Sequence, residues 1–255
     1  MPETLRVLIT VKTYPLPSVK YHELVCTAGV LSDGSFVRLY PINYRNLPYL
    51  QWFRKYQWVN VVAERNSRDP RPESFRPVDG SRIAPIGEPL DPTNNWAERK
   101  KYVLAKGVQT MCGLQSLPKH KRSLGIIRPR DVSKFITEGT DRHWKPRIEA
   151  LLRQQCLFGP DRKPLEKIPY KFSYSFLCED HDCKGHTMMI EDWEIGELYR
   201  SMLIKFRNEG VAVRKVKEKF YDQMCAGDRD THFFVGTVLR HGTWVILGAF
   251  WPKKE

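Results

Sequence analysis

The sequence predicts a β-rich α+β fold in which two small barrel-like β units flank a helical, basic middle segment. Runs rich in β-branched and aromatic residues, typical of strands, gather toward the two ends of the chain. The middle carries helical spacing and most of the excess positive charge. A length of 255 residues suits one large domain or two small ones that share an interface. We therefore divide the chain into residues 1–92, 93–160 and 161–255.

The N-terminal unit is predicted to be mostly strand. Strands are expected over Leu5–Val11, Glu23–Val30 and Gln57–Glu64, and the alternating run SFVRLYPI forms a fourth after the turn at Asp33-Gly34. A short aromatic helix is expected over Asn46–Tyr56. The Pro-rich stretch 65–92 is predicted to be an irregular connection.

The rest of the chain alternates between helices and strands. In the middle segment we expect helices over Asn95–Lys106 and Trp144–Cys156, with the strand SLGII between them. Tyr170–Cys178 alternates aromatic and polar residues with a period of two, as a half-buried strand does. Helices over 192–208 and 211–224 and a closing hairpin around His241-Gly242 complete the prediction.

The charge distribution favours a polyanionic partner. The net charge is +13, and residues 99–147 hold 13 basic residues against 3 acidic ones. Such a concentrated positive field attracts nucleic acid by counterion release, although a solvated basic face without a partner would look the same in the sequence. The apolar runs are too short to span a bilayer, and residues 1–5 do not resemble a secretory signal. We expect a cytoplasmic protein that does not associate with membranes.

Several motifs resemble those of an uncharacterised group of prokaryotic proteins. The matching stretches are YPLPSVKYHELVCTAGVLSDGSFVRLYP, RPES, SLGIIRP, PYKFSYSFLCEDHDCKGH, DWEIGELYR and the FFVG…WVILGAFWP ending. The opening also resembles the first barrel of dual-OB-type domains, in which a strand with VC.AG precedes a turn and R.YP. The resemblance implies two OB-like barrels and a place in a mobile-element or defence system. It assigns no catalytic residue.

Cys178, Cys183 and His186 form the strongest local motif. Thiolate and imidazole are the ligands that tetrahedral Zn²⁺ prefers, and structural zinc sites place close pairs of ligands on a turn between strands. The six cysteines are otherwise scattered, so a disulfide framework is not indicated. The motif predicts a structural zinc ion, with two structural thiols and a surface histidine as the alternative. The candidates for a fourth ligand are His181, His232, Cys225 and Asp180.

Basic and aromatic residues suggest a nucleic-acid contact surface. OB-type barrels stack bases on aromatic rings while Lys and Arg follow the sugar–phosphate backbone. No pattern here suggests base reading, so we expect recognition of backbone or shape. Core packing and ordinary solvated loops are the competing explanations. The candidate residues are Arg38, Tyr40, Tyr44, Arg45, Lys100, Lys101, Lys119, Lys121, Arg122, Arg128 and Arg130.

The sequence is also compatible with two other function classes. Asp69 with Glu73, or Glu191 with Asp192 and Glu194, could bind Mg²⁺ as in a metal-dependent nuclease. Surface ion pairing and the start of a helix are the simpler explanations for these acids, so the sequence leans against an enzyme. The segment 178–197 holds seven acids and one lysine, which would suit a protein-interaction subunit that docks a basic partner.

Overall fold

The N-terminal strands close into a five-stranded barrel in the computed structural model, which describes residues 1–18, 22–78, 82–118, 120–158, 164–239 and 242–255. The hydrogen-bonded order is β1-β3-β4-β6-β5, and β5 pairs again with β1. Counting barrel strands along the chain, this order is 1-2-3-5-4-1, a Greek-key barrel of the OB type. The strands are β1 (Glu3–Lys12), β3 (His22–Val30), β4 (Phe36–Ile42), β5 (Trp58–Arg65) and β6 (Ser74–Pro77).

The barrel closes because its long first strand pairs on both edges. Leu8 of β1 faces Val30 of β3 on one side and Trp58 of β5 on the other. The β4–β6 pair is parallel, with Leu39 opposite Phe75. Irregular register in the β1–β3 and β3–β4 pairs curls the sheet, as bulges do. Two short strands extend this sheet, β2 (Leu16–Ser18) beside β3 and β7 (Ala84–Ile86) beside β5.

The C-terminal strands repeat the same connectivity. They form two three-stranded sheets, β9-β10-β11 and β8-β12-β13. A parallel bridge between Ile190 and Ile246 joins the sheets on one side, and β8 runs directly into β9 on the other. With β8 and β9 taken as one bent first strand, the order is again 1-2-3-5-4-1. The strands are β8 (Leu124–Ile127), β9 (Pro129–Gly139), β10 (Tyr170–Cys178), β11 (His186–Met189), β12 (His232–Thr237) and β13 (Trp244–Phe250).

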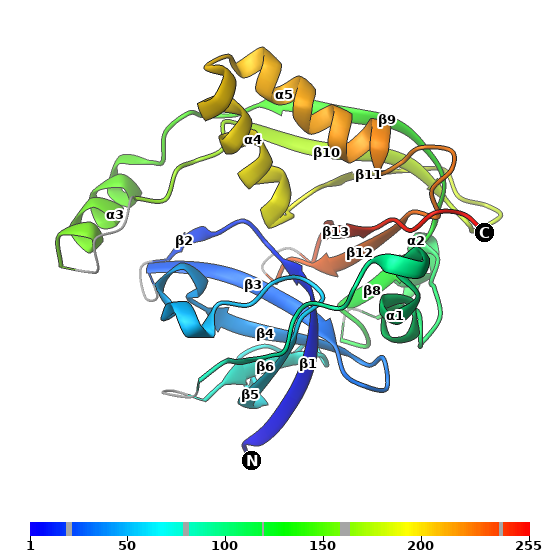
Figure 1. Ribbon diagram of the computed structural model, residues 1–255, viewed down its shortest axis with the longest axis horizontal. Coiled ribbons are helices and arrows are strands. Elements are labelled where there is room, and N and C mark those ends of the chain that lie inside the picture. The colour runs from blue at the N-terminus through cyan, green and yellow to red at the C-terminus, as the bar shows by residue number, and fades with distance from the viewer. Residues whose placement is uncertain (19–21, 79–81, 119, 159–163, 240–241) are drawn as a thin grey trace.

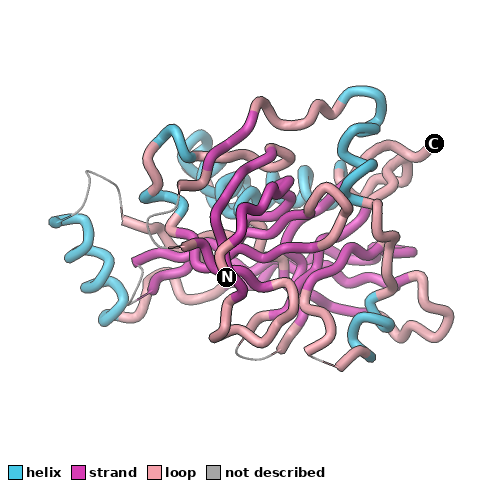
Figure 2. Tube along the Cα trace, turned by 90° about the horizontal axis from the view of Figure 1, so that it is seen from below, coloured by secondary structure: helices cyan, strands magenta, loops and turns pink. Residues whose placement is uncertain are grey.

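The helices lie mostly around the edge of the strands (Figure 2). In Figure 1, α4 and α5 lie over β9–β11, where Tyr199 and Val216 pack into the core formed by Phe172 and Tyr174. The helix α3 extends away from the barrels in the same view. The α-helices are α1 (Thr93–Val103), α2 (Met111–Ser116), α3 (Pro146–Phe158), α4 (Trp193–Phe206) and α5 (Glu209–Lys217), with short helical turns at η1 (Tyr44–Asn46), η2 (Tyr49–Gln51) and η3 (Glu218–Gln223).

The sequence expectation of a β-rich α+β fold with two OB-like units is confirmed, and several elements differ in detail. The aromatic helix expected over Asn46–Tyr56 is replaced by η1 and η2, separated by Pro48, which lacks the N–H that a continuous helix needs. The second C-terminal helix ends at Lys217 and continues as the π-helical turn η3. Residues 93–160, expected as a separate segment, contribute β8 and β9 to the second barrel.

The two barrels share an apolar interface. Val11 and Ala28 of the first barrel pack in one cluster with Leu124, Phe234 and Leu247 of the second. Ala28 lies on β3, the second strand of its barrel, where an OB fold ordinarily presents its binding face. This face of the first barrel is therefore covered by the second barrel.

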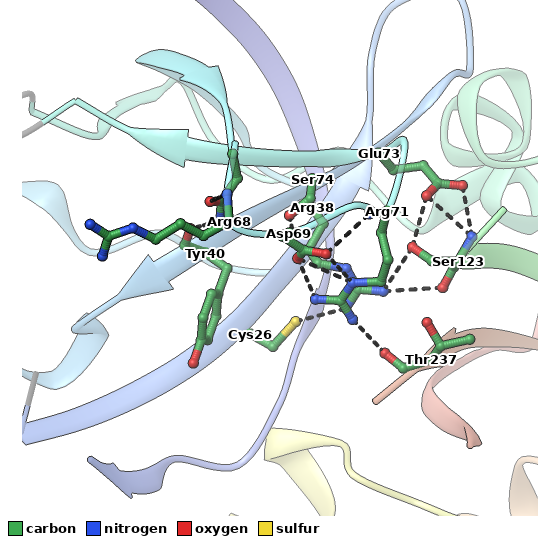
Figure 3. A network of polar contacts seen from close by, with 11 residues as sticks. Cys26, Arg38, Tyr40, Arg68, Asp69, Arg71, Glu73, Ser74, Ser123 and Thr237 are labelled. Carbon is green, nitrogen blue, oxygen red and sulfur yellow. Dashed lines mark hydrogen bonds and ion pairs between the residues drawn. The ribbon is translucent and has the colours of Figure 1, made fainter. Parts of the chain in front are cut away.

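A polar network crosses the same interface (Figure 3). Arg38 of β4 is 2% exposed and donates to the Ser123 carbonyl oxygen (3.1 Å) and to Cys26 Sγ (3.1 Å). The Glu73 carboxylate accepts hydrogen bonds from the Ser123 backbone N–H and hydroxyl. Arg71 pairs with Asp69 and donates to the Thr237 carbonyl oxygen (2.6 Å). These contacts anchor β4 and the β5–β6 loop to the start of β8 and to the end of β12.

A buried ion pair links the barrels at a second point. Lys55 Nζ lies 2.8 Å from both Asp192 carboxylate oxygens and 3.1 Å from Glu194. The Lys55 and Asp192 side chains are 8% and 2% exposed. Asp192 also caps α4 by accepting a hydrogen bond from the Glu194 N–H. The pair therefore attaches the start of α4 to the first barrel.

No helix in the part of the chain that the structure describes is both long and apolar enough to cross a membrane.

The buried pair predicts a large difference between two neighbouring substitutions. Lys55→Met leaves the Asp192 carboxylate buried without its partner, which should lower the free energy of unfolding by about 3–5 kcal/mol. Arg54→Met is the control, because Arg54 forms an ion pair with Glu88 that is exposed on both sides. It should cost no more than about 1 kcal/mol. Urea unfolding monitored by circular dichroism measures the free energy of unfolding of both variants. An equal loss in the two variants would contradict a structural role for the buried pair.

Candidate metal centre and nucleic-acid interface

Four side chains converge at one end of the second barrel in an arrangement that could hold a metal ion. Cys178 ends β10, Cys183 lies in the following loop, His186 begins β11 and Cys112 comes from α2. Their ligand atoms all lie within 4.8 Å of one another. Among the described residues, this is the only such group of three or more His, Cys, Asp and Glu side chains. Every cysteine whose side chain is described is a free thiol.

The distances within the cluster match tetrahedral coordination. Cys112 and Cys178 Sγ are 3.6 Å apart, and His186 Nε2 lies 3.4 Å from Cys112 Sγ and 3.3 Å from Cys183 Sγ. A tetrahedral Zn²⁺ with ordinary bond lengths separates two sulfurs by about 3.8 Å and a sulfur from a nitrogen by about 3.6 Å. The Cys178 and Gly185 N–H groups donate to Cys183 Sγ, and Gly185 has a φ of +98°, so the loop folds around this sulfur. The backbone thus orients the ligands.

The fourth member, Cys112, was not among the sequence-based candidates. It lies 66 residues before Cys178 and belongs to no recognisable spacing motif, so only the packing of α2 against β10 brings it in. The other candidates do not belong to the cluster, and Asp180 accepts a hydrogen bond from the Asp182 N–H. His181 is exposed and pairs with Asp182, Cys225 donates to the Phe220 carbonyl oxygen, and His232 contacts the Asp230 carbonyl oxygen.

The thiols of the cluster differ in acidity. Burial acts to raise the pKa of Cys178, but hydrogen bonds involving Cys112, Asp180, His186 and Cys183 lower this pKa to about 6. Burial, followed by the hydrogen bonds with Cys178 and Cys183, raises the pKa of Cys112 to about 12. Because ligands must be deprotonated to bind a metal, metal binding here releases protons.

A cleft of about 690 Å³ is lined in part by elements that also carry the metal ligands. Leu114 of α2 and Thr187 of β11 line it, whereas the four ligands themselves do not. Trp244 of the β12–β13 hairpin and Arg71 of the first barrel also line the cleft, as do His120 and Arg122, which follow α2. The basic segment and both barrels therefore meet at this cleft.

The structure divides the predicted phosphate contacts into two groups. Lys100, Lys101 and Arg128 form ion pairs with Glu255, Glu98 and Asp230. The side chains of Lys121, Arg122 and Arg130 make no hydrogen bond or ion pair with any described residue. Arg122 is half-buried in the cleft, and the other two are exposed. Lys119 lies outside the described residues.

The candidates from the first barrel are placed mostly inside the protein. Arg38 belongs to the buried interface network, and Tyr44 is 6% exposed, with its hydroxyl donating to the Phe53 carbonyl oxygen. Neither side chain is available to a ligand on the surface, because the second barrel covers Arg38 and the core of the first barrel encloses Tyr44. Arg45 forms an ion pair with Glu23, and Tyr40 is half-buried. The exposed aromatic side chains described in this region are Tyr49, at 82%, and Trp52, at 43%.

Of the five carboxylates considered for a nuclease, all except Glu191 have structural partners. Asp69 accepts hydrogen bonds from Arg71 and Ser74, and although its partial burial acts to raise its pKa, these bonds lower the pKa overall. Glu73 caps the start of β8 through Ser123. Asp192 and Glu194 bind Lys55. In the acidic segment, Glu179 also pairs with Arg128 and Glu197 with Arg200, so much of its charge is compensated within the chain.

The metal cluster predicts a measurable metal content. The purified protein should carry about one metal ion per chain, and Cys112→Ser should abolish this content and lower the melting temperature, since metal-binding energy is folding energy. Cys225→Ser, which changes a half-buried thiol outside the cluster, should keep the ion. Elemental analysis with thermal unfolding measures both. A metal-free wild-type protein, or a Cys112→Ser variant that keeps its ion, would refute the site.

Comparison with known proteins places the chain in a family but does not describe an activity. Two solved structures cover nearly the whole chain at a TM-score of 0.33: a murine DNA-binding protein bound to double-stranded DNA (8% identity, 99% of this chain, 97% of that chain) and the tetrameric p202 HIN2 (7% identity, 100% and 92%). At these identities and TM-scores, the similarity does not indicate a function for this chain. No curated protein matched the sequence.

Residues 3–105 match the model described as Domain of unknown function (DUF8758), and residues 107–255 match Domain of unknown function (DUF8757). The chain belongs to the DUF8757 family.

Proposed function

We propose that this protein binds nucleic acid through the sugar–phosphate backbone, along the cleft between α2, β11 and the β12–β13 hairpin. The observation that carries the proposal is Arg122. This half-buried guanidinium lines the cleft and has no partner among the described residues, whereas Lys100, Lys101 and Arg128 are already ion-paired. A phosphate oxygen would complete the hydrogen bonds that Arg122 lacks.

The position of the cleft supports the proposal. Oligonucleotides bind OB folds across the second and third strands and against the loop between the fourth and fifth strands. In the second barrel these are β10, β11 and the β12–β13 connection, and residues of the last two line the cleft. The corresponding face of the first barrel is buried, so the second barrel offers the accessible one.

We further propose that the metal ion is a structural zinc that shapes this cleft. Three thiolates and one imidazole are a typical closed zinc set, which leaves no open position for a reacting water. The ion would join α2, which precedes His120 and Arg122, to the start of β11. We also retain a role as an accessory subunit of a mobile-element or defence system, on the resemblance of the opening motif.

The proposal predicts a salt-dependent affinity for nucleic acid. For the double variant Lys121→Ala/Arg122→Ala, the slope of log K against log[salt] should fall by about 1.4–1.8, because each phosphate contact contributes about 0.7–0.9. Lys101→Ala is the matched control, since this lysine is exposed but paired with Glu98, and its slope should stay near that of the wild type. Fluorescence anisotropy with single- and double-stranded DNA and RNA gives these slopes. An unchanged slope in the double variant would show that the cleft does not bind phosphates.

We also expect that the protein does not cleave nucleic acid. Hydrolysis by metal ions needs two or more carboxylates around a metal with access to an attacking water. Asp69, Glu73 and Asp192 are instead held by internal hydrogen bonds and ion pairs. Incubation of labelled DNA and RNA with the protein in Mg²⁺, then in Mn²⁺, should leave them intact. Cleavage that disappears in Glu73→Gln would support the nuclease instead.

A further inference from the structure

A second cavity, of about 220 Å³, lies at the opposite end of β11 from the cleft. Thr187 and Met188 line the cleft, whereas Met189 and Ile190 line this cavity. The cavity is smaller than the roughly 300–1,000 Å³ of pockets that enclose drug-sized ligands. Its size therefore suits one flat ring system with a polar substituent.

Aromatic rings form the walls of this cavity, and each is held in place. Tyr14 packs against Gly196, where a Cβ atom would lie 2.4 Å from the Tyr14 ring, and its hydroxyl donates to the Glu166 carbonyl oxygen. The Trp144 indole N–H donates to the Leu165 carbonyl oxygen. Tyr170 donates to Glu209. Because their polar groups are engaged elsewhere, these side chains contribute mainly apolar ring surface to the cavity.

The cavity also contains a carboxylate without a partner. Asp192 and Glu191 both line it, but Asp192 is bound to Lys55. The Glu191 side chain makes no hydrogen bond or ion pair with any described residue, and burial raises its pKa. The side chain is half-buried. Its carboxylate oxygens are therefore able to accept hydrogen bonds from a ligand in the cavity.

Lysines lie at the edge of the same cavity. Lys171 is exposed and its side chain is unpaired within the described part of the chain. Lys167 donates to the His143 carbonyl oxygen and lies over the Trp144 ring. Thus a hydrogen-bond acceptor lines the cavity and a cation lies at its edge. The acceptor complements the amine of an amino-bearing base, and the cation complements an attached phosphate.

A polar track connects the cavity with the cleft. Lys171, Ser173 and Ser175 alternate along β10 and so face the same side of the sheet. Ser175 lies opposite Thr187, which lines the cleft. From Lys171 to Ser175 the strand advances about 13 Å.

We propose that this cavity holds a single nucleotide, with an amino-bearing base between the aromatic rings, its exocyclic amine donating to Glu191, and its phosphate beside Lys171. The inference extends the proposed function, because a strand that follows the polar track from the cleft would bring one base to the cavity. Stacking on aromatic faces and hydrogen bonds to the edge of the base are the means by which proteins hold an extruded base.

Mononucleotides test the cavity without the cleft. At pH 8, isothermal titration should show CMP binding at least tenfold more tightly than UMP. CMP presents an amine where UMP presents a carbonyl oxygen, which a carboxylate repels. Glu191→Gln should reduce this preference to less than threefold, since an amide can both donate and accept. Lys171→Ala should weaken the binding of CMP and leave the binding of cytidine, which has no phosphate, unchanged.

The control separates this inference from the proposed function. Lys121→Ala/Arg122→Ala should bind CMP as the wild type does, even if it no longer binds oligonucleotides. A single-stranded oligonucleotide containing 2-aminopurine distinguishes the two sources of the base. If CMP competes with this oligonucleotide for binding, the cavity takes a base within a strand. If the two do not compete, the cavity takes a free nucleotide. Equal affinity for CMP and UMP, or a preference that survives Glu191→Gln, would overturn the assignment.

Discussion

The arrangement of the whole molecule depends on the burial of one barrel face against the other barrel. The outer surface of β3 and β4 packs on residues of β8, β12 and β13, and Arg38 closes this interface through Ser123. An unpaired guanidinium in such a position would be very unfavourable, so its hydrogen bonds constrain how β4 and β8 approach each other. The consequence for function is that the first barrel supports the second, which keeps its own β10–β11 surface exposed to solvent.

Much of the fold could be predicted because strand alternation and turn residues are local signals. Tyr170–Cys178 was predicted with its bounds, and the two-barrel architecture followed from strand-forming runs at both ends. The short helical turns around Pro48 and the contribution of β8 and β9 to the second barrel were not predicted. The latter depends on pairing with β10 and β12, which lie tens of residues away, and no local pattern encodes such a partner.

The candidate site was predicted in part for the same reason. Cys178, Cys183 and His186 lie within nine residues and form a recognisable group, whereas Cys112 reaches them only through the packing of α2. Arg38 and Tyr44 have the composition of a binding face, but burial assigns them to the interface and the core. The sequence does not distinguish these roles, because aromatic and basic side chains occur on binding faces and also in buried interfaces and cores. It also gave no sign of Glu191 as an unpartnered acceptor, since that property exists only after the cavity has formed.

Hydrogen–deuterium exchange of the complex shows whether the second barrel holds nucleic acid. With a saturating oligonucleotide, we expect slower exchange in residues 111–118, 171–175, 186–189 and 237–239, which border the cleft and the polar track. Exchange in the η2 turn around Tyr49, which is more exposed than the neighbouring aromatic Trp52, should not change. Protection confined to that turn, with no change around the cleft, would show that the first barrel binds instead.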